Sequence, residues 1–262
     1  MSSVVTPAIV LHAFDYSESS RIVRLATRAA GVQSVMARGA RRSAKRFGAA
    51  LDLFAEGEAQ FAVRAGRDLH TLERFDIARS RRGLGEALAR FEGASALCEV
   101  MLRVAAADDE GALAFDALAD GLDALADAPP TVAPVTTLRA IWRLLAALGF
   151  EPALDQCVQC GTPLPPGQAI AFAPRVGGAL CDDCARLTPA RPLPAWARAQ
   201  LAGWLAPVEA APSPLGPLDA AVLKAHRRLL AGFVHAHLTD GQALRAFDAW
   251  AGGPTEPDGP PL

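Results

Sequence analysis

Residues 53–78, LFAEGEAQFAVRAGRDLHTLERFDIA, place two strand-like runs on either side of a short polar turn. Between the apolar residues Phe54 and Phe61, polar positions alternate with small ones, as Glu56, Glu58 and Gln60 show. Alternation with a period of two is typical of a strand that is buried on one face only. The turn AGRD at 65–68 contains a glycine and joins this run to the next. The stretch therefore predicts a β-hairpin.

Three similar runs precede the hairpin. They are PAIVLHAF at 7–14, SRIVRLAT at 20–27 and VQSVMARG at 32–39, and each is rich in β-branched residues and bounded by turn signals. Together with the hairpin they give five short strands within about 80 residues. Many short strands in so little chain predict a small closed barrel or a sandwich.

Beyond residue 80 the apolar period changes to that of helices. Residues 84–107 place Leu88, Phe91 and Cys98 on one expected helix face, and further helices are expected at 110–127, 136–150, 194–205 and 217–238. The predicted organisation is a barrel at 1–80, a helical domain in two parts at 81–152 and 191–251, a metal-binding module at 153–190 and a disordered tail at 252–262.

Basic residues are unevenly distributed along this chain. In total, 26 Lys and Arg stand against 28 Asp and Glu, a formal net charge of −2. Between Glu18 and Asp52, however, there are cations and no acid: Arg21, Arg24, Arg28, Arg38, Arg41, Arg42, Lys45 and Arg46. Such a stretch predicts a polyanionic partner, and the excess of Arg over Lys favours bidentate contacts to phosphate. The alternative is an ordinary solvated surface.

Four of the five cysteines form two C-x2-C pairs, CVQC at 157–160 and CDDC at 181–184. Two such turns direct four thiolates at one tetrahedral point, so the spacing predicts one structural Zn²⁺ per chain held by Cys157, Cys160, Cys181 and Cys184. With four sulfur ligands, no coordination position is left for a catalytic water. The alternative is a pair of redox-active dithiols, which requires a thioredoxin-like context that is not evident. Cys98 is predicted to be an inert core residue.

Signs of catalysis are absent from the sequence. It contains no phosphate-binding glycine loop, no G-x-S-x-G turn and no cluster of metal-binding carboxylates, and its five histidines are scattered. These absences argue against an enzyme. The N-terminus has no basic region followed by an apolar run, and no stretch of 18 apolar residues occurs, so we expect a cytoplasmic protein without a membrane contact.

Several blocks together resemble the RecO family of bacterial recombination mediators and DNA repair proteins. The blocks are IVLHAFDYSESSRIVRLATRAAG, ARGARRSAKRFGAALDLF, DLHTLERFD, LLAALGFEPALDQCVQCG and FAPRVGGALCDDCA, which begin at residues 9, 37, 68, 144 and 172. Their order and spacing are more specific than any single block. The resemblance implies an N-terminal OB-fold, a mostly helical C-terminal region and a zinc module inserted into that region.

The resemblance also implies a function. RecO-like proteins bind single- and double-stranded DNA and anneal complementary strands. With RecR, they help to load RecA onto DNA coated by single-strand-binding protein. The helical region of the family contacts the acidic tail of single-strand-binding protein. This activity implies association with the nucleoid. The residues that match the basic block of the family are Arg38, Arg41, Arg42, Lys45 and Arg46. Extensions of this patch are expected at Arg21, Arg24, Arg79, Arg81 and Arg82. Not every RecO has the four cysteines, so the zinc prediction rests on the spacing in this chain.

Two alternatives remain open at this stage. Phe47 lies inside the basic stretch, where it either stacks on a base or anchors the barrel core. For the whole chain, the alternative function is a zinc-ribbon adaptor whose basic barrel binds RNA or a transcription or ribosomal partner.

Overall fold

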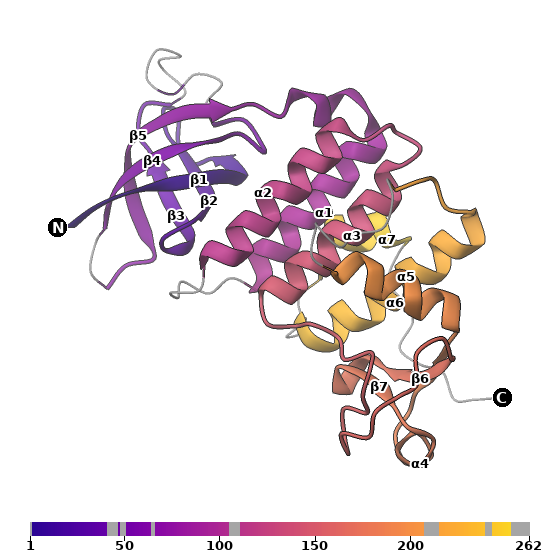
Figure 1. Ribbon diagram of the computed structural model, residues 1–262. Coiled ribbons are helices and arrows are strands. Elements are labelled where there is room, and N and C mark those ends of the chain that lie inside the picture. The colour runs from indigo at the N-terminus through magenta and orange to yellow at the C-terminus, as the bar shows by residue number, and fades with distance from the viewer. Residues whose placement is uncertain are drawn as a thin grey trace.

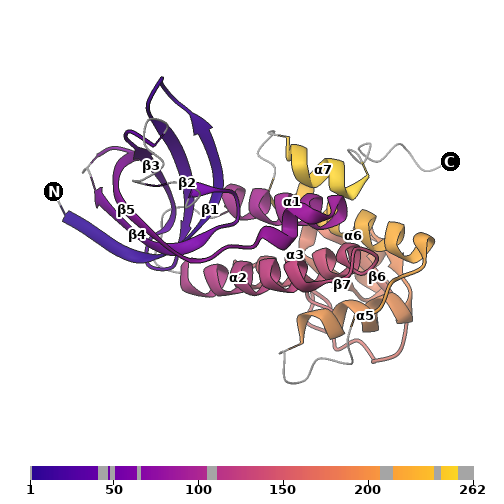
Figure 2. The same cartoon turned by 90° about the horizontal axis from the view of Figure 1, so that it is seen from above.

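The computed structural model describes residues 2–40, 47, 51–63, 66–104, 111–206, 215–238 and 243–252. A β-barrel that includes the N-terminus lies beside a group of helices, and a small β-module lies on the side of the helices away from the barrel (Figure 1). Helices α1 (Leu88–Val104) and α2 (Gly111–Asp127) run side by side, each with one end toward the barrel (Figure 2).

The barrel confirms the five predicted strands. They are β1 (Ser2–Asp15), β2 (Arg21–Thr27), β3 (Gly31–Ala37), β4 (Glu56–Val63) and β5 (Leu69–Arg79). Around the barrel the order is β1-β2-β3-β5-β4, and β4 pairs back to β1, so the sheet is closed. All neighbouring pairs are antiparallel except β3 and β5, which are parallel. This is the five-stranded OB-type barrel that the family resemblance implied.

Alternate residues of the strands fill the barrel. Val23, Leu25 and Val35 point inward, as do Phe61 of the hairpin and other apolar side chains of the same cluster. Phe47 belongs to this cluster and is only 4% exposed. Phe47 is therefore a core anchor in this structure, and the stacking alternative for it does not hold there.

A bulge in β1 divides its outer surface into two parts. The pairing with β2 shifts between Val10 and His12, so that Leu11 is the extra residue. Ile9, which precedes the bulge, and Leu11, the bulge residue, join the large apolar cluster of the helical region. The core of the helical region therefore extends onto the outer surface of the barrel, whose interior is a separate apolar cluster, and this contact fixes their relative position.

The helical region contains α3 (Ala133–Ala147), α5 (Ala195–Leu205), α6 (Ala220–Leu238) and α7 (Arg245–Ala251) in addition to α1 and α2. One detail of the prediction for 84–107 was wrong. Leu88 is 73% exposed and Phe91 is 40% exposed, whereas Leu97, Cys98 and Met101 are buried. Residues 84–86 belong to a separate 3-10 turn, η2 (Arg82–Glu86), so the α-helix begins only at Leu88. Its buried face therefore differs from the one predicted for a single helix over 84–107.

Cys98 confirms its predicted role. Its side chain is 2% exposed within the core. Burial raises the pKa of this thiol to about 12, because the thiolate would lose its hydration. Cys98 is therefore an inert apolar residue at neutral pH.

The β-module comprises β6 (Ile170–Ala173), η3 (Pro174–Val176), β7 (Gly178–Leu180), α4 (Asp182–Ala185) and β8 (Arg191–Leu193). Its sheet has the order β7-β6-β8. Gly178 has a φ of +155°, and a Cβ there would lie 2.4 Å from the carbonyl oxygen of Ala153. Only glycine allows this close approach, which brings the segment before Cys157 against β7. Among the described residues, no helix is both long and apolar enough to cross a membrane.

Candidate metal centre and nucleic-acid interface

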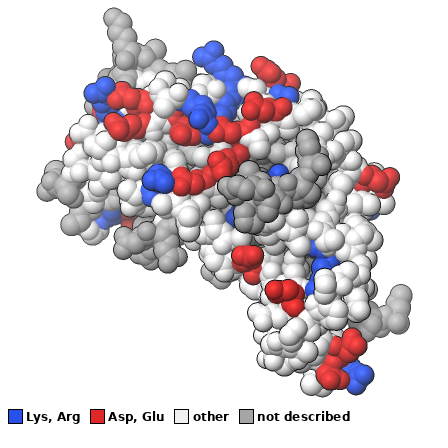
Figure 3. Space-filling model, viewed as in Figure 1, with Lys and Arg blue, Asp and Glu red and all other residues white. Residues whose placement is uncertain are grey.

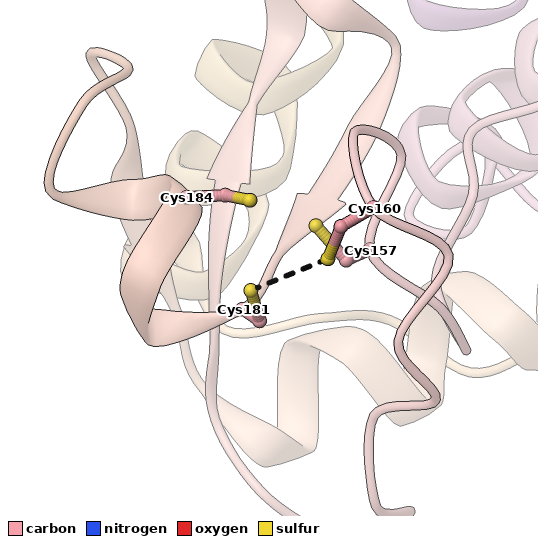
Figure 4. A group of neighbouring side chains, drawn as sticks. All are labelled: Cys157, Cys160, Cys181 and Cys184. Atoms are coloured by element: carbon pink, nitrogen blue, oxygen red, sulfur yellow. Dashed lines mark hydrogen bonds between the residues drawn. The ribbon is translucent and has the colours of Figure 1, made fainter.

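The two C-x2-C pairs meet in the β-module. Cys157 and Cys160 lie in a turn closed by a hydrogen bond from the backbone N–H of Gly161 to the carbonyl oxygen of Cys157. Cys181 directly follows β7, and Cys184 lies on α4. Their sulfur atoms point toward one another (Figure 4), and all four lie within 4.8 Å of each other.

The spacing of the sulfurs fits a tetrahedral metal ion. Four sulfurs at about 2.3 Å from a Zn²⁺ stand roughly 3.8 Å apart, because that is the edge of such a tetrahedron. The sulfurs of Cys160 and Cys181 are 3.7 Å apart. The Val158 N–H also donates to the Ala179 carbonyl oxygen at 2.9 Å, which ties the first turn to β7. The four cysteines can therefore bind one metal ion, and an all-sulfur set favours a soft or borderline ion.

Backbone hydrogen bonds lower the thiol pKa of Cys157, and a metal ion binds the thiolate form. A backbone hydrogen bond from Cys181 is the largest influence on Cys157 and, with those from Cys160 and Gln159, lowers its thiol pKa to about 6. The neighbouring Cys181 raises the pKa of Cys184 to about 12, with burial adding to the effect. Four thiolates do not coexist at this distance without a cation, so full ionisation of the set requires a bound metal.

The predicted basic patch is only partly within the described residues. Arg41, Arg42, Lys45 and Arg46 lie outside them, so their positions are not part of this description. Arg38 directly follows β3 and is exposed. Arg21 and Arg24 lie on β2, and Arg21 donates to Asp15 at 3.0 Å. Arg24 is partly buried, and its Nε has no hydrogen-bond partner among the described residues.

The basic group at the end of β5 and just after it lies mainly at the junction between the barrel and the helices. The guanidinium of Arg81 donates to Asp123 on α2 at 2.6 Å, to the Phe54 carbonyl oxygen at 3.0 Å, and to Glu56. Its side chain is 1% exposed. Arg79 also pairs with Asp123 and is 55% exposed, and Arg82 is exposed. Arg81 is thus occupied as an internal ion-pair partner, and we leave it out of the interface.

Carboxylates far away in sequence reach the cation-rich window. Arg28 donates to Asp116 on α2 at 2.9 Å, although the sequence has no acid between Glu18 and Asp52. The pKa of Asp116 is lowered, because this hydrogen bond favours the ionised carboxyl. On the face seen in Figure 3, acidic and basic side chains lie next to each other over the barrel and the adjoining helices. Arg28 is therefore not a free cation of the predicted basic surface.

The histidines of the helical region have structural partners. His226 is buried, its Nε2 lies 2.7 Å from the Gln200 side-chain oxygen, and burial lowers its pKa to about 4. His235 lies 2.7 Å from Asp248, and His237 donates to the Pro174 carbonyl oxygen. None of these belongs to the cysteine cluster.

Two exposed aromatic residues were not among the predicted site residues. Phe14 at the end of β1 is 44% exposed, and Tyr16 in the following turn is 60% exposed. Their signal in the sequence is weak, because an aromatic residue in a strand is more often part of the core.

Comparisons with known proteins agree over nearly the whole chain. Residues 1–81 match the family described as Recombination protein O N terminal, and residues 85–245 match Recombination protein O C terminal. DNA repair protein RecO of Anaeromyxobacter dehalogenans strain 2CP-C is 36% identical, over 94% of this chain and 96% of that protein. DNA repair protein RecO of Rubrobacter xylanophilus is 31% identical, again over 94% of this chain and 96% of that protein.

Proposed function

Because this chain belongs to the RecO family of DNA repair proteins, we propose that it is a non-enzymatic DNA-binding mediator of recombinational repair. In this role it binds single- and double-stranded DNA, anneals complementary strands and, with RecR, assists the loading of RecA onto DNA coated by single-strand-binding protein. Its partners are then DNA, RecR and the tail of single-strand-binding protein, with RecA indirectly, and its place is at the nucleoid in the cytoplasm.

The observation that carries this proposal is a closed OB-type barrel with an unusually cation-rich segment between β2 and the hairpin. OB barrels bind strands across the face of β2 and β3 and with the loops beside it. Arg24 lies on that face, and the segment with Arg38, Arg41, Arg42, Lys45 and Arg46 follows β3 directly. Arg21, Arg79 and Arg82 extend the patch in the proposal.

Zinc has a structural role in this proposal. We assign one Zn²⁺ per chain to the four cysteines, because an all-thiolate tetrahedral set is typical of structural zinc. All four positions are protein ligands, so the ion stabilises the module and leaves no position for a reacting water. The redox alternative is disfavoured by the same arrangement, since two separate dithiols need not share one centre.

Salt dependence of single-stranded DNA binding tests the patch. Affinity falls as salt rises, so the slope of log affinity against log salt is negative. Replacing Arg38, Arg41, Arg42 and Arg46 together by Ala should make this slope shallower by roughly 3. Each phosphate contact on a single strand contributes about 0.7 to that slope through counterion release. The measurement is fluorescence anisotropy of a labelled oligomer at several salt concentrations.

A matched control removes the same charge from the part of the chain outside the barrel. Arg175, Lys224, Arg228 and Arg245 are exposed there and are replaced by Ala in the control variant. Its slope should stay at the wild-type value. If the control makes the slope as shallow as the barrel variant does, the barrel patch is not the binding site. Equal slopes for DNA and RNA oligomers with tighter RNA binding would favour the RNA-binding adaptor instead.

A further inference from the structure

The outer face of β1, β2 and β3 beyond the bulge carries two rows of residues. The register aligns Phe14 with Ile22 and Met36, and it aligns His12 with Arg24 and Ser34. The positions between these rows belong to Ala13, Val23 and Val35, which pack inside the barrel. Because neighbours along a strand point to opposite faces, both rows point outward.

This outer face is not covered by the helices. Ile9 before the bulge and Leu11 at the bulge pack into the helical core, whereas Phe14 beyond the bulge is 44% exposed. Tyr16, in the turn that follows β1, is 60% exposed. The described phenylalanines elsewhere in the barrel half, Phe47, Phe54, Phe61 and Phe75, are at most 5% exposed. Phe14 and Tyr16 are therefore the described aromatic rings of the barrel half that a ligand can reach.

The ring of Phe14 has a neighbour on this face, and the backbone that carries Tyr16 is held by hydrogen bonds of the turn. The ring of Phe14 lies 5.8 Å from that of His12. The turn after β1 is closed by a hydrogen bond from the Tyr16 N–H to the Ser20 carbonyl oxygen at 3.0 Å, and the Ser20 N–H donates to the Ser17 hydroxyl at 3.2 Å. A ligand that stacks here therefore has little ordering of the protein backbone to overcome.

Three arginines lie near these rings in the strand register or in the sequence. Arg24 lies in the row next to Phe14, and its Nε is covered but has no hydrogen-bond partner among the described residues. Arg38 is exposed two residues beyond Met36, at the end of β3 next to this face. Arg21 pairs with Asp15 beside Tyr16. Exposed rings bordered by arginines complement a strand that offers bases and phosphates together.

We propose that Phe14 and Tyr16 stack on bases of an unpaired DNA strand whose phosphates reach Arg24 and Arg38. This inference rests on the proposed function and assigns a preference to it. A single strand exposes its base faces, whereas a duplex keeps them stacked on each other. The barrel therefore binds single strands more tightly than duplex at equal phosphate contacts, and it does so with little dependence on sequence, since every base has a face to stack.

Replacing Phe14 and Tyr16 together by Ala tests the stacking. Affinity for a single-stranded oligomer should fall about 5-fold to 150-fold for each base that loses its ring. The slope of log affinity against log salt should not change, because no charge is removed. Duplex affinity should stay within about 2-fold. The conservative variant, Phe14→Tyr with Tyr16→Phe, should restore single-strand binding.

Ile77→Ala is the matched control, since Ile77 is also an apolar residue of the barrel and is 47% exposed, on β5. It should leave single-strand affinity unchanged. Photocrosslinking to an oligomer that contains 5-iododeoxyuridine, followed by peptide mass spectrometry, should place the crosslinks at Phe14 or Tyr16.

The outcomes separate the two proposals. If the wild type binds no DNA, the proposed function itself fails. If the wild type binds and the double alanine variant matches it, or loses single-strand and duplex binding equally, the stacking is overturned while DNA binding stands. Unchanged affinity with no crosslinks at these rings would leave the face as a surface for an apolar protein partner.

Discussion

Replacing Cys157 with Ser should unfold the β-module and abolish binding of the metal ion. The buried core of the module around the cysteines consists of Cys157, Ala173 and Leu180 only. So small a core does not hold a fold alone, and structural metals supply the missing stability in such modules. Structural zinc contributes apparent binding free energy on the order of 10 kcal/mol, which is comparable to the net stability of a whole domain.

The loss of stability in Cys157→Ser should extend from residues 153–190 to the adjoining helices. Ile170 and Phe172 of β6 and Leu193 of β8 belong to the same apolar cluster as the helical region. When the module unfolds, these side chains leave that cluster, so we expect a lower melting temperature for the helical region as well. Hydrogen exchange measured by mass spectrometry should show lost protection in the module first.

Cys98→Ala is the control for the cysteine variant, because Cys98 is buried in the helical core and lies outside the cluster. Elemental analysis should give one zinc per chain for the wild type and for this control, and none for Cys157→Ser. Equal metal content and equal melting in all three proteins would refute the metal centre.

Replacing Arg81 with Met should destabilise the chain by about 3 kcal/mol. Its guanidinium is 1% exposed and bridges Glu56 of the barrel and Asp123 of α2. Removal of one partner from a buried ion pair leaves uncompensated charge, which costs about 3–5 kcal/mol. The lower end applies here, because the two carboxylates keep side-chain exposures of 21% and 31%. Urea unfolding monitored by circular dichroism measures this free energy.

Arg79→Met provides a comparison at the same carboxylate. Arg79 also pairs with Asp123, but its side chain is 55% exposed, and exposed pairs contribute under about 1 kcal/mol. Adding Glu56→Gln and Asp123→Asn to Arg81→Met should recover part of the loss, because the unpaired charges disappear. Equal destabilisation by Arg79→Met and Arg81→Met would contradict the assignment of Arg81 as the internal link between barrel and helices.

The features that were predictable from the sequence depend on residues close together in the chain. Alternation around Phe61 predicted the hairpin, and the strand count predicted a small barrel or a sandwich, because each strand reveals its buried face within a few residues. The C-x2-C spacing of Cys157 and Cys160 likewise determines where two sulfurs point. These predictions are confirmed as a closed barrel and a four-cysteine cluster.

What the sequence could not provide depends on contacts between distant segments. Arg28 and Asp116 are separated by 88 positions, and Arg81 and Asp123 by 42. A count of charge along the chain treats Arg28 and Arg81 as free cations, although the fold pairs both. The same limit applies to Leu88, which has helical spacing but lies on the exposed side of α1, because the choice of buried face is made by the neighbouring elements.

We propose that this chain brings complementary DNA strands together without catalysis. Annealing of two complementary oligomers, labelled as an energy-transfer pair, tests it most directly, first with bare strands and then with strands coated by single-strand-binding protein. We expect the wild type to accelerate annealing in both cases without any nucleotide cofactor. The variant with Arg38, Arg41, Arg42 and Arg46 replaced by Ala should anneal strands near the spontaneous rate. A wild-type protein that leaves the spontaneous rate unchanged would contradict the claim.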